Sequence, residues 1–358
     1  LDLKNYNSKN LQTNWVKVFE KALEKNLFIH PRFLKTIKET RKNLKNTISN
    51  DHMLSVLNII ISKKDPINVL HDLNDTRILS EIFPEFGRIW GQVQFDIYHH
   101  YTTDEHLLLT LHSLSELKKN SFYNEVYSRL NLRESLHVAL IFHDIGKKGP
   151  KSHSIYGKEL TGKIFKRLPL KKEAQELCLW LIENHLIMSD IAFKYDTQDP
   201  DAIAKFTAIA NTEEKINSLF LFTLCDIASV GPNILNEWRI SLLRSLFYNS
   251  RDFLQRGLDI SSYSSSVQNS IKKSVLEKVD LSQKKFIKKQ IANFPPQFWE
   301  AFNARMIIDI LKIYKNNLDN NISESVNFLN YQNKEYSAVV IICKNRPGIL
   351  KDIVFGFS

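Results

Sequence analysis

Two side chains with metal-binding chemistry stand next to each other at the end of an apolar run. Residues 139–147 (ALIFHDIGK) place His143 and Asp144 where a buried helix is predicted to end, and a glycine and Lys147 follow. Burying an imidazole beside a carboxylate is costly unless a cation compensates them. A two-residue pattern is a weak signal alone, so the hypothesis of a metal site depends on further ligands elsewhere in the chain.

Four more residues of the same kinds occur where apolar or structural residues are expected. His106 lies in the first turn of a predicted helix, and His153 lies in a predicted polar loop. His185 ends a predicted helix, and Asp226 interrupts an apolar one. An unpaired carboxylate inside an apolar helix is unfavourable. The hypothesis therefore requires all six side chains to converge in space.

The composition of this set indicates the chemistry. Imidazole and carboxylate together suit Mg, Mn, Fe or Zn, and the absence of cysteines near them argues against a structural zinc site. An aspartate between two histidine-bearing segments can bridge two ions. Paired ions about 3.5–4 Å apart activate water and hold a phosphoryl group. Lys147 is then a candidate contact for a phosphate oxygen.

The pattern resembles the HD superfamily of metal-dependent phosphohydrolases. The resemblance implies that one metal is ligated by His106, His143, Asp144 and Asp226, and that His153 and His185 match extra ligands of two-metal members. We take His143, Asp144 and Lys147 as candidate catalytic residues. Lys147 and Arg239 are candidate substrate-binding residues, and a solvated helix face is the alternative for Arg239.

A narrower resemblance is to the bifunctional uridylyltransferase/uridylyl-removing enzymes of nitrogen control. It rests on residues 95–99 (FDIYH), 101–106 (YTTDEH), 184–189 (NHLIMS) and 226–232 (DIASVGP). That family adds UMP to the PII signalling protein in one domain and removes it in an HD domain. Residues 345–350 (NRPGIL) resemble the opening of its first ACT domain, a glutamine-sensing module. The resemblance implies PII as partner, glutamine as regulator, and Mg or Mn as the metal.

The predicted fold is mainly α. We expect a helical segment at 1–95, an HD domain at 96–250, a helical linker at 251–333, and the truncated start of an ACT domain at 334–358. Thr102 and Glu105 match a capping box, which predicts a helix from about residue 103. The chain begins with Leu1 and stops within a predicted element, so we expect a fragment of a longer protein whose nucleotidyltransferase domain is absent.

The bulk composition is that of an ordinary globular protein, with 43% hydrophobic and 25% charged residues among 358. The apolar runs are too short to span a bilayer, and the three cysteines are widely spaced, so we expect reduced thiols and a cytoplasmic location. A net charge of +10 makes nucleic acid a partner to consider. The lysines are spread over the whole chain, however, and we expect no nucleic-acid binding.

These observations favour a uridylyl-removing phosphodiesterase that hydrolyses UMP from uridylylated PII. Two alternatives stay open from the sequence. One is another HD nucleotide phosphohydrolase, similar to guanosine tetraphosphate hydrolases, which also combine HD and ACT domains. The other is a regulatory fragment without catalytic turnover.

Overall fold

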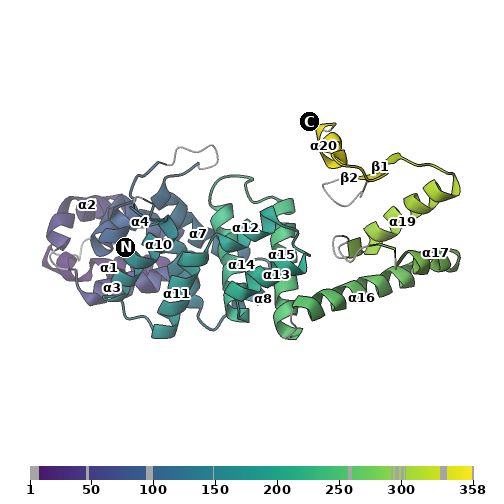
Figure 1. Ribbon diagram of the computed structural model, residues 1–358. Helices are drawn as coiled ribbons and strands as arrows, with labels where there is room; N and C mark the ends of the chain where they lie inside the picture. Colours follow the sequence, from purple (N-terminus) through teal and green to yellow (C-terminus); the bar gives the residue numbers. More distant parts are fainter. Residues whose placement is uncertain are drawn as a thin grey trace. The chain divides into compact units, whose positions relative to one another are not determined.

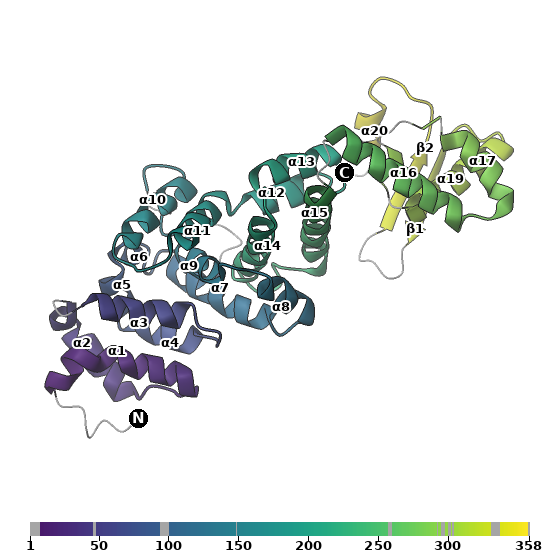
Figure 2. The same cartoon turned by 90° about the horizontal axis from the view of Figure 1, so that it is seen from below.

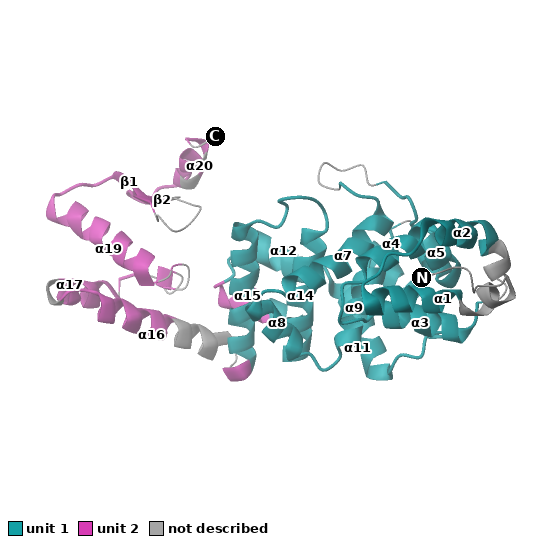
Figure 3. Ribbon diagram, turned by 180° about the vertical axis from the view of Figure 1, so that it is seen from behind, with its two compact units in different colours: residues 1–197, 205–254 teal, residues 198–204, 255–358 magenta. Residues whose placement is uncertain are grey.

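The chain forms two compact units, shown in different colours in Figure 3. Unit 1 contains residues 1–197 and 205–254, and unit 2 contains residues 198–204 and 255–358. The computed structural model describes residues 8–45, 48–93, 100–147, 149–256, 260–291, 293–294, 298–299, 302, 304–330 and 337–356. The predicted motif at 95–99 lies outside these residues.

Unit 1 is built from helices, as the sequence predicts (Figure 1). In chain order they are α1 (Ser8–Lys25), α2 (Pro31–Lys45), α3 (Asn50–Ile60), α4 (Ile67–Asp75), α5 (Ile78–Ile82), α6 (Pro84–Gly87), α7 (Thr103–Leu117), α8 (Ser121–Ser128), α9 (Arg133–Phe142), α10 (His153–Phe165), α11 (Lys172–Asn184), α12 (Ile187–Lys194), α13 (Pro200–Ile209), α14 (Glu213–Ala228) and α15 (Glu237–Arg256). Part of α13, residues 200–204, belongs to unit 2. No described helix has an apolar stretch long enough to cross a bilayer.

The centre of unit 1 consists of α7, α9, α11 and α14, which pack against one another (Figure 2). Helix α9 is buried without interruption from Ser135 to Phe142, and α14 from Ile216 to Cys225. A helix that is buried on all sides must be surrounded by other helices. Its hydroxyls must also find partners, and Ser135 Oγ donates to the Ala174 carbonyl of α11 at 2.9 Å. These central helices carry most of the candidate ligands.

Helix α7 begins at the predicted residue, but the predicted capping box is wrong. The Thr102 side chain makes no capping hydrogen bond. Glu105 instead lies 2.9 Å from His71 Nε2, and Asp104 accepts a hydrogen bond from Asn74 Nδ2, also at 2.9 Å. Both partners come from α4, so tertiary contacts with α4, and not a local cap, hold the first turn of α7.

The structure corrects the prediction for His153. The polar loop ends at Ser152, which is the N-cap residue of α10, and His153 is the first residue of that helix. Helix α14 begins with a side-chain cap, because Thr212 Oγ1 accepts a hydrogen bond from Lys215 N at 3.2 Å. Such caps satisfy one of the unpaired amides at a helix start.

Unit 2 contains α16 (Ile260–Lys278), α17 (Leu281–Ile291), α19 (Ala304–Asp319), β1 (Ser325–Asn330), β2 (Ser337–Ile342) and α20 (Ile349–Phe355). Its core gathers Trp299 with apolar residues of α16, α17 and α19, such as Val275, Ile287 and Ile307. The two strands are antiparallel, with Ser325 opposite Ile342. Strand β2 lies in the segment predicted to open an ACT domain. Strand β1 was not predicted, because it lies in the segment predicted to be a helical linker.

One buried histidine of the central helices should make the stability of unit 1 depend on pH. His137 Nδ1 lies 2.8 Å from the Ile60 carbonyl and its Nε2 lies 2.9 Å from the Tyr127 hydroxyl. Burial lowers the pKa of His137 to about 4. The unfolded chain therefore binds one more proton than the folded chain between about pH 4 and 6.5, so this residue reduces stability as the pH falls through that range.

We predict that His137→Gln, which keeps one donor and one acceptor but does not titrate, weakens this dependence. Between pH 6.5 and 4 the free energy of unfolding of the wild type should fall more than that of the variant, by up to about 3 kcal/mol. Urea unfolding of both proteins with EDTA at several pH values measures the difference. Parallel pH profiles would contradict the assignment.

Candidate metal centre

The six candidate residues lie together in unit 1. The first group involves three helices: His106 from α7, His143 and Asp144 from the end of α9, and Asp226 from α14. Asp226 Oδ1 lies 3.0 Å from His106 Nε2 and 3.4 Å from His143 Nε2. Asp144 Oδ2 lies 3.9 Å from His106 Nε2 and 3.5 Å from His143 Nε2. Four potential ligand atoms thus face one small volume.

A second group shares Asp144 with the first. The other carboxylate oxygen, Asp144 Oδ1, lies 3.9 Å from His153 Nε2, which in turn lies 3.4 Å from His185 Nε2. In the set of Asp144, His153 and His185, the ligand atoms lie within 4.8 Å of one another, as they do in the set of His106, His143 and Asp144. One carboxylate with an oxygen toward each histidine group is the arrangement that a bridging ligand needs.

Backbone carbonyls orient three of the four imidazoles. The Nδ1 atoms of His106, His143 and His185 lie 3.1, 3.0 and 2.7 Å from the carbonyls of Ser229, Leu140 and Ile182. A carbonyl only accepts, so each Nδ1 carries the proton and, in the neutral ring, the Nε2 lone pair faces the cluster. This is the arrangement that fixes the tautomer of metal-binding histidines.

The positions of two of these histidines explain how the carbonyls become available. His143 and His185 are the C-cap residues of α9 and α11, and each ring bonds the carbonyl three residues before it. The last carbonyls of a helix have no partner within the helix. Phe222 of α14 packs against both rings, with centroids at 5.1 and 5.9 Å. The rings are therefore held by hydrogen bonds and by packing.

The electrostatics of the cluster favour ionised carboxylates. Burial alone would raise the pKa of Asp144, but His143 and Lys147 outweigh it and lower the pKa. The pKa of Asp226 is also lowered, because His143 and His106 overcome the effect of burial. For His143, burial opposes protonation, yet the two carboxylates raise its pKa. Positive charge is thus stabilised in the first group.

The histidines of the second group behave differently. Burial, together with the neighbouring His143, lowers the pKa of His185 to about 4. Burial also lowers the pKa of His153. Both rings are therefore neutral near pH 7, which is the form that binds a metal ion.

The residues fit a divalent cation. Among the described residues, His143 Nε2 and Asp144 Oδ1 are buried atoms without a hydrogen-bond partner. Leaving such atoms unpaired costs about 1–3 kcal/mol each, and more for a charged group. Both atoms point into the cluster, one in each group. A cation bound there would satisfy both, and the nitrogen and oxygen donor set suits Mg, Mn, Fe or Zn.

Of the two basic candidates, the structure brings only Lys147 to the cluster. Lys147 Nζ lies 2.6 Å from Asp144 Oδ2. Arg239 belongs to α15, where its Nη1 donates to the Ile234 carbonyl at 2.7 Å and its guanidinium lies 5.7 Å from the Phe193 ring. These contacts hold Arg239 against the loop before α15 and against α12, and its predicted role toward substrate stays a prediction.

A close approach of two glycines joins the two groups, and the sequence analysis missed it. A Cβ atom on Gly146 would lie 2.2 Å from the His153 carbonyl oxygen and 2.4 Å from Gly157 N. A Cβ atom on Gly157 would lie 2.8 Å from the His143 carbonyl oxygen. Only glycine allows the turn after α9 to touch the first turns of α10. This contact sets the position of His153 relative to Asp144.

Comparison with known proteins agrees with this geometry. Residues 103–226 match the family model of the HD domain. The matched segment begins at the first residue of α7 and ends at Asp226, so it contains all six candidate ligands. The match covers the central helices of unit 1, and the mainly α fold class is confirmed.

Curated relatives extend the similarity on both sides of the HD domain. The chain is 32% identical to the bifunctional uridylyltransferase/uridylyl-removing enzyme of Ruegeria pomeroyi over 81% of its length, and that stretch is 33% of the relative. It is 29% identical to the enzyme of the same name from Rhodospirillum rubrum over 94% of its length, or 37% of the relative. The chain therefore spans about a third of the length of the curated relatives it matches.

We predict that Gly146→Ala destabilises unit 1 by about 1–3 kcal/mol, because the added methyl group meets backbone atoms that cannot move cheaply. It should also weaken Mn²⁺ binding by displacing His153 from Asp144. Gly162→Ala, in the middle of α10 with open space around it, is the matched control and should be neutral or stabilising.

Urea unfolding in EDTA and competition of Mn²⁺ with a chelator measure the two effects. Equal stability and equal Mn²⁺ affinity for Gly146→Ala and the wild type would show that the close contact does not position the cluster.

Proposed function

We propose that the HD domain of this chain is a metal-dependent phosphodiesterase that removes UMP from uridylylated PII. The observation that carries the proposal is the sharing of Asp144 between two groups of histidines in a domain that matches the HD family. The names of the relatives, which are uridylyl-removing enzymes, support the reaction and the UMP group. Because the chain spans about a third of those relatives, the partner protein and the substrate belong to the proposal.

Two cations can be assigned to the side chains of the cluster. We assign His106, His143, Asp144 and Asp226 to one, and Asp144, His153 and His185 to the other, with Mg or Mn as the metal. When bound, divalent cations of this kind neutralise phosphate charge and lower the pKa of a water molecule. Carbonyls of Ser229, Leu140 and Ile182 keep the imidazoles aligned for this role.

Lys147 supplies a fixed positive charge beside the cluster. Its side chain is 18% exposed, so the ammonium lies between the buried carboxylate of Asp144 and solvent. That position suits contact with a non-bridging phosphate oxygen of an incoming phosphodiester. A tyrosine of PII would leave as a phenolate with a pKa of about 10, so little general-acid assistance is required.

The remainder of the chain is assigned by the same resemblance. We propose that residues 1–95 follow a nucleotidyltransferase domain of the parent enzyme, and that 334–358 open an ACT domain through which glutamine regulates the reaction. Strand β2, the turn at Pro347 and Gly348, and α20 are consistent with the start of an α/β unit. The domain boundary near residue 95 is part of this proposal.

The proposal predicts that Asp144→Asn abolishes most hydrolysis. Loss of a residue that hydrogen-bonds a metal ligand typically lowers metal affinity or activity about 10–100-fold. Loss of the shared ligand itself should therefore lower the rate of UMP release by about 100-fold or more. Asp190→Asn, an exposed aspartate paired with Lys194 on α12, is the matched control and should be as active as the wild type.

The assay is release of UMP from uridylylated PII with Mn²⁺, with guanosine tetraphosphate as a second substrate. Equal rates for Asp144→Asn and the wild type would contradict the proposed role. Preferred hydrolysis of guanosine tetraphosphate would contradict the substrate. Metal binding without any hydrolysis would favour a regulatory fragment.

A further inference from the structure

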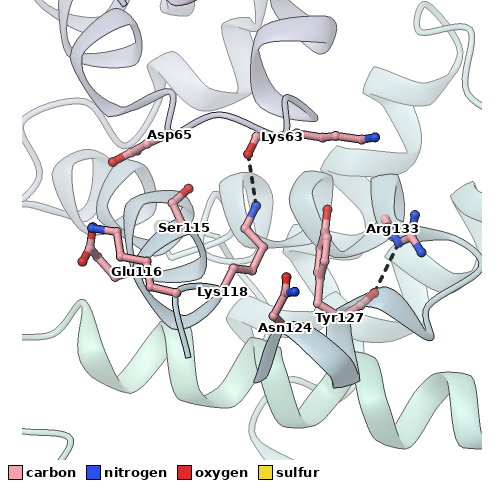
Figure 4. Close-up of a pocket in the computed structure, with 9 residues that line it drawn as sticks. Lys63, Asp65, Ser115, Glu116, Lys118, Asn124, Tyr127 and Arg133 are labelled. Carbon is pink, nitrogen blue, oxygen red and sulfur yellow. Dashed lines mark hydrogen bonds and ion pairs between the residues drawn. The ribbon is translucent and has the colours of Figure 1, made fainter. Parts of the chain in front are cut away.

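Unit 1 contains a second polar site, at the opposite end of α7 and α9 from the metal cluster. A pocket of about 410 Å³ is formed by the loop between α3 and α4, the last turn of α7, α8, and the first residue of α9 (Figure 4). His106 and Lys118 are twelve residues apart on or just after α7, which corresponds to roughly 18 Å along a helix. The pocket is therefore separate from the candidate metal centre.

The two carboxylates of the pocket already have partners. Asp65 Oδ2 lies 2.7 Å from His112 Nδ1, and Glu116 Oε1 lies 2.6 Å from Lys119 Nζ. In Figure 4 both carboxylates lie on the same side, away from Arg133. Four basic side chains line the pocket, so three of them remain after these pairs are formed.

Those three cations have no carboxylate partner among the described residues. Lys118 Nζ contacts the Lys63 carbonyl at 3.5 Å and lies 4.8 Å from the centre of the Tyr127 ring. Arg133 donates from Nε to the Tyr127 carbonyl at 3.2 Å and from Nη2 to the Ser128 carbonyl. The Lys63 side chain extends along the top of the same space in Figure 4.

The position of Lys118 is unfavourable without an anion. Its side chain is partly buried, and burial lowers its pKa, although the Asp65 carboxylate of the same pocket acts in the opposite direction. The loss of solvation is a cost that a nearby negative charge would offset. The neutral contacts that Lys118 makes, a carbonyl and an aromatic ring, offset it only in part.

Tyr127 gives the pocket a rigid wall. Its hydroxyl is held 2.9 Å from Nε2 of the buried His137, so the ring is fixed between α8 and α9. The guanidinium of Arg133 lies 5.6 Å from the centre of this ring. A fixed ring between two cations presents a preformed site, which reduces the entropic cost of binding.

We propose that this pocket binds a small phosphorylated molecule, with its phosphate group held by Lys118, Arg133 and Lys63. A phosphate group carries nearly two negative charges and three terminal oxygens, so it can meet three cations at once, whereas a carboxylate carries a single charge. The volume lies within the range of small-ligand sites. Asn124 and Ser115 supply polar contacts for the remainder of the ligand.

The test must separate this pocket from the metal cluster, which would also attract phosphate. Isothermal titration of the whole chain with pyrophosphate, in EDTA and at constant ionic strength, measures binding without metal ions. Lys118→Gln removes one cation. Asn124→Asp adds a carboxylate of nearly the same shape at an exposed position, so it keeps the test valid if Lys118→Gln fails to fold.

We expect saturable 1:1 binding to the wild type, weakened about tenfold or more in each of these variants. Lys172→Gln, an exposed lysine of α11, and Lys147→Gln, at the metal cluster, should bind as the wild type does. Absence of saturable binding to the wild type would overturn the proposal. So would wild-type affinity in folded Lys118→Gln or in Asn124→Asp, or loss of binding in Lys147→Gln.

Discussion

Two ionised carboxylates among buried imidazoles are the constraint on which the rest of unit 1 depends. Asp144 and Asp226 cannot stay charged in that environment without compensating positive charge. Lys147 and the histidines supply part of it, yet His143 Nε2 and Asp144 Oδ1 make no hydrogen bond among the described residues. A cluster built in this way is more stable with a cation than without one. The carbonyls that fix the Nδ1 atoms of His106, His143 and His185, the Phe222 ring and the contacts from α4 all maintain that geometry.

The sequence was most informative at positions where a polar or ionisable residue occurs in a segment predicted to be buried. Polar residues such as Asp226 in an apolar helix stand out by type, so the sequence analysis could single out all six, and the structure brings them together. Their role as ligands stays a prediction. These signals are local, because each depends on residues within a few turns.

The features that the sequence analysis missed depend on contacts between segments that are distant in the sequence. Glu105 fitted a local cap but pairs with His71, because α4 lies against the start of α7. The contact of the Ser229 carbonyl with His106 could not be predicted, because every residue has a backbone carbonyl and nothing in the sequence marks this one. Gly146 was assigned only the end of a helix, whereas its main effect is to let α10 approach. Strand β1 has alternating exposure and pairs with β2, but the sequence analysis assigned its residues to a helical linker.

The central claim is that the described His and Asp side chains hold divalent cations, and Mn²⁺ tests it most directly. Pulsed electron paramagnetic resonance of Mn²⁺ added to the metal-free chain detects nitrogen nuclei of bound imidazoles. We expect clear nitrogen coupling, and a loss of most of the bound Mn²⁺ when Asp144 is replaced by Asn. A spectrum of fully hydrated Mn²⁺ with no nitrogen coupling, in folded protein, would contradict it.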